Sequence, residues 1–288
     1  MQEITEHFID LEKVIHDKNQ HLAKSLPKFI LKYLVRVVHQ EELNGTIYRN
    51  RDKFGLDFCN AILNEFQAII NVKGLENISP NGRFIIASTH PLGGLDGMAL
   101  MSVCGRRRSD IVFPVNDLLL NLPNFRTLFI PINMLGSNIE NVTLIEETFA
   151  SDKLVLYFPA GLCSRKQKGK IMDLQWKKTF VTKAIRYKRD VIPCFIEGRN
   201  SNFFYNFANL RKRLGIKSNI EMLFLVDEMY KQKNKTINIT FGKPISYAVF
   251  DKSLNHSAWA QKLRAFTYEM GKGNNTSFEE FIKTNSIE

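Results

Sequence analysis

A histidine and an aspartate six positions apart are the residues of this sequence best suited to acid–base chemistry. His90 follows a short, mostly apolar run over residues 84–89, and Asp96 comes after a Gly93-Gly94 pair. A histidine held by a carboxylate is a common general base, because the carboxylate fixes the tautomer and orientation of the ring. The two glycines can adopt backbone angles closed to other residues and can let a substrate approach the main chain.

The same stretch also has a purely structural interpretation. Asp96 precedes the apolar run 97–104 and can act only as the N-cap of a helix there, and His90 can be a core histidine with satisfied hydrogen bonds. Both interpretations require the same local structure: a buried strand over residues 84–89, a tight glycine loop, and a helix near residues 97–104.

Strands and helices alternate along the rest of the chain. Apolar runs predict further strands over residues 111–115, 127–132, 154–158, 191–196, 222–226 and 237–241. Helical patterns fall near residues 139–150, 174–188, 202–213 and 256–270, and a polar link then leads to a short final helix. This alternation predicts an α/β domain over residues 76–288, with a largely parallel central sheet flanked by helices.

Residues 1–75 are expected to form a helical segment beside that domain, with helical patterns over residues 1–24, 25–40 and 54–70. In the middle stretch Lys28, Lys32 and Arg36 recur on one side, opposite apolar side chains. A basic amphipathic helix of this kind can lie on an anionic membrane surface. A helix packed on its own domain with a solvated basic face explains the pattern equally well.

Composition narrows the classes of partner. The 288 residues carry a net charge of +11, which favours anionic partners such as anionic lipid, phosphorylated substrates or nucleic acid. No zinc-finger spacing, aromatic RNP pattern or recognition-helix motif supports nucleic-acid binding.

The four cysteines are scattered, which predicts reduced thiols rather than disulfides or a metal site. The chain opens without a secretory pattern, and its apolar runs are too short to span a bilayer, so we expect a soluble or peripheral protein.

The stretch 154–170 has the composition of an anion site. A predicted strand ends at Phe158-Pro159, Gly161 permits a tight turn, and Ser164, Arg165 and Lys166 follow. Backbone N–H groups at a glycine turn, together with cations, can hold an anion. A solvated basic loop is the ordinary alternative for such a charge run.

Two further predicted strands end near polar or aromatic residues. The strand over residues 127–132 leads into Asn133, and the strand over 191–196 contains Pro193, which indicates an edge or a bulge. An aromatic cluster follows at residues 203–207. It can wall an acyl chain, enter lipid, or simply pack in the core of a phenylalanine-rich protein.

Together these four stretches resemble the four sequence blocks of PlsC-like glycerolipid acyltransferases. The segments HPLGGLDG, FIPIN and FPAG are similar to a bacterial subgroup described as hemolysin-like or aminolipid O-acyltransferases. The resemblance implies a glycerol-3-phosphate acyltransferase-like α/β fold, with His90 as the base and Asp96 as its partner. It also implies substrate contacts at Gly93, Gly94, Asn133, Gly161, Ser164, Arg165, Lys166 and Pro193.

Three departures from the family pattern stand out. The family spaces its histidine and aspartate as H-x4-D, whereas five residues lie between His90 and Asp96, and we expect the glycine pair to loop out the extra one. Asn133 occupies the position of an arginine that contacts the acceptor's phosphate, and Ala160 replaces the glutamate of F-P-E-G-T-R-S. The last two favour a lyso-aminolipid acceptor, such as an N-acyl ornithine or N-acyl glycine lipid, over lysophosphatidic acid or another lysophospholipid.

The implied reaction moves a fatty acyl group from a thioester of acyl carrier protein or coenzyme A to a hydroxyl, at the inner face of the cytoplasmic membrane. It requires no cofactor or metal, and N–H groups near Gly93 or Gly161 are expected to stabilise the oxyanion. Two other classes stay open. A hydrolase would use Cys163 or Ser164, although the G-x-S-x-G elbow is missing. A lipid-binding scaffold would keep the fold without the chemistry.

Overall fold

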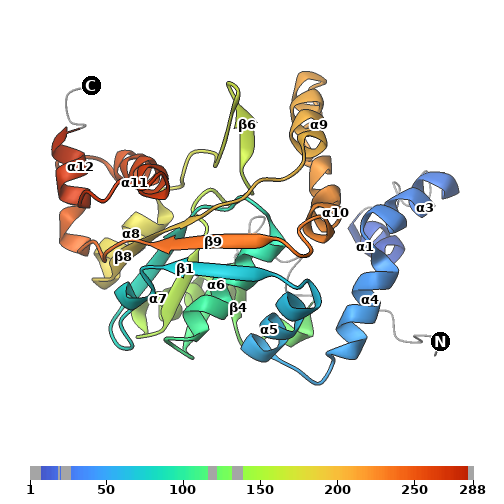
Figure 1. Ribbon diagram of the computed structural model, residues 1–288, viewed down its shortest axis with the longest axis horizontal. Helices are drawn as coiled ribbons and strands as arrows, with labels where there is room; N and C mark the ends of the chain where they lie inside the picture. The colour runs from blue at the N-terminus through green and yellow to red at the C-terminus, as the bar shows by residue number, and fades with distance from the viewer. Residues whose placement is uncertain (1–7, 19, 21–26, 116–121, 132–138, 285–288) are drawn as a thin grey trace.

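A seven-stranded sheet forms the centre of the computed structural model, which describes residues 8–18, 20, 27–115, 122–131 and 139–284 (Figure 1). The strand order is β1-β9-β8-β2-β5-β3-β4, and every neighbouring pair is parallel except β8 with β9. The strands span Ile69–Lys73 (β1), Phe84–Ser88 (β2), Ile111–Val115 (β3), Phe129–Pro131 (β4), Leu154–Tyr157 (β5), Asp190–Ile196 (β8) and Thr236–Phe241 (β9). The predicted α/β class and largely parallel sheet are therefore confirmed.

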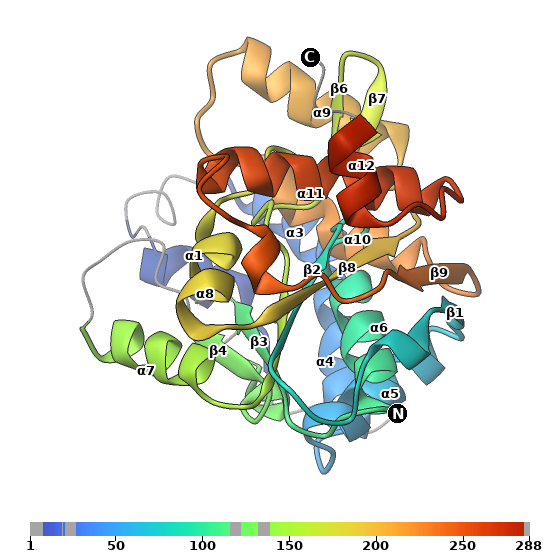
Figure 2. The ribbon, with the colours of Figure 1, turned by 90° about the vertical axis from the view of Figure 1, so that its left-hand side faces the viewer.

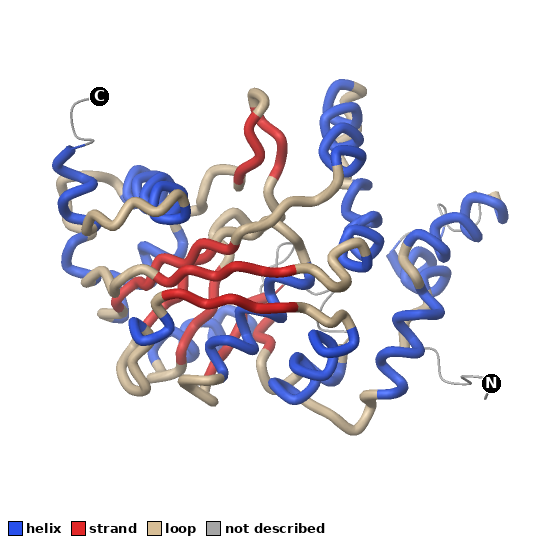
Figure 3. Tube along the Cα trace, in the orientation of Figure 1, coloured by secondary structure: helices blue, strands red, loops and turns tan. Residues whose placement is uncertain are grey.

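Helices cover both faces of this sheet, so both faces of its central strands are buried and those strands read as continuous apolar runs (Figures 2 and 3). One face packs against α5 (Gly55–Glu65) and α6 (Gly94–Gly105). The other face packs mainly against α8 (Thr179–Tyr187) and α11 (His256–Gly271), with α7 (Ile139–Ala150) and α12 (Phe278–Thr284) beside them.

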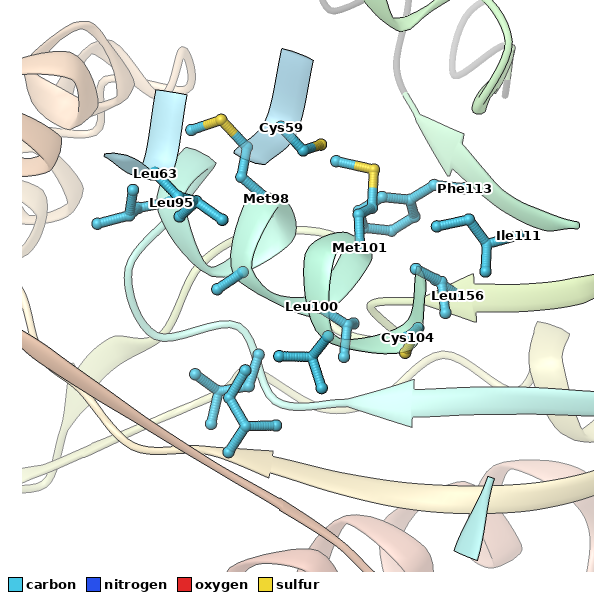
Figure 4. Packing of buried hydrophobic residues seen from close by; sticks show 14 of the residues in the cluster. Cys59, Leu63, Leu95, Met98, Leu100, Met101, Cys104, Ile111, Phe113 and Leu156 are labelled. Atoms are coloured by element: carbon cyan, nitrogen blue, oxygen red, sulfur yellow. The ribbon is translucent and has the colours of Figure 1, made fainter. Parts of the chain in front are cut away.

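Helix α6 is the element that carries the predicted aspartate, and it is apolar nearly all round. Every residue from Leu95 to Cys104 is buried. Figure 4 shows Met98 and Met101 beside Cys59 of α5, with Phe113 of β3 close by. A helix buried on all sides has little freedom to shift, and its first turn is therefore a rigid support for a functional side chain.

The N-terminal helices α1 (Leu11–Lys18), α3 (Lys28–Val37) and α4 (Gln40–Arg49) lie to one side of the sheet (Figure 1). The predicted helical segment is present, but its end is misplaced. The helix expected over residues 54–70 ends at Glu65, and β1 then joins the edge of the main sheet. The α/β fold therefore begins before the predicted boundary at residue 76. None of the described helices is long and apolar enough to cross a membrane.

The strand predicted over residues 222–226 is wrong. This stretch is the 3-10 helix η4 (Ile220–Phe224) followed by α10 (Leu225–Tyr230). A short apolar run fits a buried strand or a buried helix equally well, and here Met222, Phe224 and Leu225 pack against Cys163 and Phe204.

A small hairpin, β6 (Arg165–Gln167) and β7 (Lys170–Met172), was not predicted. Its two loop residues, Lys168 and Gly169, have φ of 47° and 81°, as a type I′ turn requires. The helix α9 (Asn202–Arg213) agrees with prediction and is capped by the hydroxyl of Ser201.

Pro193 is not at an edge. It lies in β8 between β2 and β9, opposite Ala87 of β2. The ladder to β9 covers only residues 194–196, and the next pair is an isolated bridge from Val191 to Ile245. A proline without an N–H is tolerated here because the strand pairing is already interrupted.

Candidate active site

His90 and Asp96 meet at the carboxyl end of β2. The imidazole Nδ1 lies 3.0 Å from Oδ1 and 3.1 Å from Oδ2 of the carboxylate. Gly93 makes this possible, because its φ of 85° and ψ of −120° are open to glycine and strained for other residues. The two side chains therefore meet across the longer spacing, with Gly93 in the turn and Gly94 as the first residue of α6.

Asp96 also has a capping role, though not the predicted one. The N-cap of α6 is Gly93, and Asp96 stands in the first helical turn. Its Oδ2 accepts a hydrogen bond from the Leu92 N–H at 2.7 Å. The side chain is fully buried. One carboxylate therefore closes the loop and also contacts the ring, so the structural interpretation of Asp96 and the contact that a catalytic role requires are compatible.

The surroundings of His90 fix its tautomer. An ionised carboxylate only accepts hydrogen bonds, so the proton of the neutral imidazole is on Nδ1, and Nε2 keeps its lone pair. Phe158, at the end of β5, stacks on the ring with centroids 4.0 Å apart and planes 14° apart. The side chain of His90 is 17% exposed. The imidazole ring is therefore fixed in orientation, and its Nε2 is available to take a proton.

The electrostatic environment favours a basic histidine. Burial works to lower the pKa of His90, but the charge and hydrogen bond of Asp96 and the charge of Asp173 outweigh burial and a smaller opposing effect of Arg165. The pKa of His90 is therefore raised above its ordinary value of 6.5. A raised pKa makes the imidazole a stronger base toward the proton of a hydroxyl.

Ser164 lies next to His90, but its hydroxyl points elsewhere. Its backbone N–H donates to the His90 carbonyl at 2.7 Å, and its Oγ donates to Oδ1 of Asp173 at 2.6 Å. Asp173 was missed by the sequence analysis. The available signal is that it is the only acidic residue between Asp152 and Asp190, within a strongly basic stretch.

Arg165 differs most from expectation. It was predicted to meet an anionic substrate, but its side chain is only 2% exposed and forms a buried ion pair with Glu221, N–O distance 2.9 Å. Arg211 of α9 binds the other carboxylate oxygen at 2.7 Å. The Arg165 guanidinium also donates to the Cys163 carbonyl. Because its guanidinium is buried and already bonded to Glu221 and to the Cys163 carbonyl, Arg165 has a supporting position rather than that of an anion-binding cation.

Cys163 and Ser164 do not have the surroundings of a hydrolase nucleophile. Burial raises the pKa of the Cys163 thiol to about 11, despite the nearby Arg165. The Ser164 hydroxyl donates to a carboxylate and not to a histidine ring. Over the described ranges no three His, Cys, Asp or Glu side chains gather as metal ligands.

The other predicted site residues lie in different surroundings. The Gly161 N–H donates to the Phe158 carbonyl at 3.0 Å, so it is used within its own turn and not for an oxyanion. Gly94 starts α6, where the first N–H groups of a helix have no partners within the helix. Lys166 is half-buried on β6. Asn133 lies outside the described residues.

Pro193 is one strand away from His90 and belongs to the support of the site. Its ring faces Gly242, where an added Cβ would come within 2.7 Å of the proline Cγ. The sequence analysis did not single out Lys177, which lies at the turn of Gly161: a Cβ built at Gly161 would be 3.0 Å from Lys177 Nζ.

Comparison with known proteins identifies the family. A family model described as Acyltransferase matches residues 13–271. The chain belongs to this acyltransferase family. It is 47% identical over 264 residues to the lyso-glycine lipid O-acyltransferase of Phocaeicola vulgatus, covering 91% of this chain and 95% of that protein. It is 46% identical to the enzyme of the same name from Bacteroides thetaiotaomicron, covering 91% and 97%.

A solved structure, the 1-acyl-sn-glycerophosphate acyltransferase PlsC of Thermotoga maritima, is 14% identical with a TM-score of 0.46, covering 86% of this chain and 95% of that one. The candidate site of this acyltransferase lies at the carboxyl ends of β2 and β5, where His90 and Phe158 follow their strands.

Proposed function

We propose that this acyltransferase esterifies the hydroxyl of a lyso-glycine lipid, or a closely related lyso-aminolipid, with a fatty acyl group from a thioester. The His90–Asp96 pair is the observation that carries the proposal, because it provides a held base without a competing nucleophile beside it. The acceptor is suggested by relatives that match over nearly their whole length. Ala160 and Asn133, which replace the family's glutamate and arginine, also favour an acceptor other than lysophosphatidic acid.

In the proposed mechanism His90 Nε2 removes the proton of the acceptor hydroxyl as its oxygen attacks the thioester carbonyl. Asp96 stabilises the imidazolium that forms and keeps the ring in place. N–H groups in the first turn of α6, near Gly94, are suited to stabilise the developing oxyanion. When the tetrahedral intermediate collapses, the C–S bond breaks and the imidazolium returns its proton to the thiolate. The products are the ester and the free thiol.

The donor is proposed to be acyl carrier protein or coenzyme A, because cations border the site. Lys177 lies over the turn at Gly161, and Lys168 and Lys170 are exposed on the hairpin of β6 and β7. Both donors carry phosphate and present their thioester on the same phosphopantetheine arm. Basic side chains at this rim attract either donor before the acyl group reaches His90.

A lipid acceptor requires contact with a membrane surface, and we propose that α3 and α9 supply it at the inner face of the cytoplasmic membrane. Phe29 and Tyr33 of α3 are 73% and 54% exposed, beside exposed Lys28 and Lys32. This exposed surface of α3 favours the membrane interpretation over a helix packed on its own domain.

Helix α9 continues the same pattern. Leu210 and Leu214, at its end, are 51% and 66% exposed and stand among Lys212 and Arg213. Helices α3 and α9 both contact η4 and lie on the same side of the molecule (Figure 1). Apolar side chains with basic neighbours are the combination that binds anionic lipid.

Lipid mass spectrometry on the purified protein in mixed micelles tests the proposal. Acyl carrier protein and coenzyme A thioesters are each offered with lyso-glycine lipid, lyso-ornithine lipid and lysophosphatidic acid. A diacylated glycine lipid is the expected product. Free fatty acid alone would indicate a hydrolase, bound lysolipid without turnover would indicate a scaffold, and acylation of lysophosphatidic acid alone would contradict the proposed acceptor.

A further inference from the structure

A second buried carboxylate, that of Asp173, lies behind His90. Asp173 follows β7 and has no exposed surface. Its Oδ1 accepts the backbone N–H of His90 at 3.2 Å and the Ser164 hydroxyl at 2.6 Å. Its Oδ2 accepts the indole N–H of Trp176 at 2.9 Å. Three separate parts of the chain therefore meet at one side chain.

The hydrogen-bond partners of this carboxylate favour its ionised form. The N–H groups of His90 and Trp176 can only donate, and the Ser164 hydroxyl can donate as well, so both oxygens of the carboxylate have donors. Burial raises the pKa of Asp173, while the hydrogen bonds from Ser164 and Trp176 act in the opposite direction. Burying a carboxylate anion costs free energy unless donors bind it. One of these donors is the backbone N–H of His90, the proposed base.

The peptide groups of His90 are consequently held from both sides. Asp173 takes the His90 N–H, and the Ser164 N–H binds the His90 carbonyl. Asp173 is itself held from α11, because its own N–H donates to the Tyr268 hydroxyl at 2.7 Å and its carbonyl accepts from Arg264. The ring is held by Asp96 and Phe158, and the main chain by this second set of contacts.

We propose that Asp173 is a positioning residue for His90, which fixes the main chain of the base from behind and places a negative charge near its ring. The inference rests on the proposed role of His90 as the base. The charged groups that face His90 are Asp96 from α6, Asp173 after β7 and Arg165 from β6. Asp173 is thus one of two anions that make the imidazole more basic.

The test requires a variant that removes the charge without creating a clash. In Asp173→Asn alone the amide NH2 must face either the Trp176 indole N–H or the Ser164 and His90 donors. Trp176→Phe removes the indole donor, so the double variant Asp173→Asn/Trp176→Phe is compared with Trp176→Phe alone. Asp152→Asn is the matched charge control, because Asp152 is 80% exposed and precedes β5, at the amino end of the strand, whereas His90 follows the carboxyl end of β2.

The pH profile of acyl transfer separates positioning from simple structural support. A base must be neutral to act, and loss of a nearby negative charge lowers the pKa of His90, so the acid limb of kcat/KM moves to lower pH. Relative to Trp176→Phe, kcat falls about 100-fold through misplacement of the base, with little change in KM for the acceptor. Asp152→Asn keeps the parent's rate and profile.

Two outcomes overturn the inference: an unshifted acid limb, or a kcat within threefold of the Trp176→Phe rate while the variant unfolds at the same temperature. Should the double variant not fold, Ser164→Ala removes one partner of Asp173 and is expected to lower kcat about tenfold with KM unchanged; an unchanged kcat would overturn the inference as well. If His90→Ala keeps the parent's activity, the proposed base has failed instead, which is a distinct result.

Discussion

Replacing Asp96 by Asn is the perturbation whose effect follows most directly from the geometry. Asp96 serves two donors at once, the Leu92 N–H at 2.7 Å and His90 Nδ1 at 3.0 Å. Asparagine offers one oxygen and one NH2 group. Because a backbone N–H can only donate, the amide oxygen turns to Leu92, and the NH2 group takes the position of Oδ1, 3.0 Å from Nδ1. This NH2 group favours an accepting Nδ1, which moves the proton to Nε2 and takes the lone pair from the base.

The expected loss is large, although the side-chain shape is unchanged. In serine proteases, replacing the aspartate that holds the catalytic histidine by asparagine puts the ring in the wrong tautomer and lowers kcat about 10⁴-fold. At about 1.36 kcal/mol for each tenfold change, this corresponds to roughly 5.4 kcal/mol of transition-state stabilisation. The Leu92 contact persists in the variant, so the loop and the first turn of α6 should stay folded.

Product formation is measured by mass spectrometry under single-turnover conditions, and thermal unfolding is followed in parallel. Asp152→Asn provides the same chemical change on the surface. A loss of 10³-fold or more, at a thermal midpoint close to the parent's, is the expected result. An Asp96→Asn variant that keeps a tenth or more of the parent's rate would refute the reasoning from the tautomer.

Four further predictions concern the site and its surroundings. The kcat/KM of the parent should fall as pH drops through a value above 6.5, because the pKa of His90 is raised and only its neutral form acts, and a fit to the pH profile measures this. Gly93→Ala should cost about 1–3 kcal/mol of stability and most of the activity, because Gly93 has positive φ and Leu225 lies 3.2 Å from an added Cβ. Gly169→Ala is the control: Gly169 also has positive φ but no atom lies within 4 Å of an added Cβ, so this variant should lose stability and keep activity. Cys163 should react slowly with a thiol reagent at pH 7.5, because burial raises its pKa to about 11, and fast labelling of the folded protein would contradict that. Leu214→Glu should weaken sedimentation with anionic vesicles while sparing turnover in detergent micelles, and unchanged sedimentation would exclude α9 from lipid contact.

Most of the fold was predictable because its central strands are apolar and short, and helical patterns separate them. The failures are at the edges. β1 is an edge strand that pairs with β9 alone, and its residues alternate between exposed and half-buried. Its sequence therefore lacks a continuous apolar run, and it was assigned to the helix that precedes it. The hairpin strand Arg165–Gln167 has no apolar residue at all. The run 222–226 was misassigned because length and composition fit two structures equally well.

The site was predictable where function needs a particular side chain, and less so where it needs a particular environment. His90 and Asp96 are visible as residue types at a spacing that a glycine pair can close. The burial of Arg165 depends on Glu221, which is 56 residues away in the sequence. Asp173 acts through a backbone N–H, which every residue but proline carries, so no side-chain pattern announces the contact.

The central claim is that His90 is the base of an acyl transfer to a lysolipid hydroxyl. The most direct measurement is single-turnover transfer to lyso-glycine lipid by His90→Ala beside the parent, with thermal unfolding and donor binding recorded for both. The account predicts a new diacylated lipid with the parent and a loss of at least about 10³-fold with the variant, at similar stability and donor affinity. A variant that forms the product at near the parent's rate would contradict it.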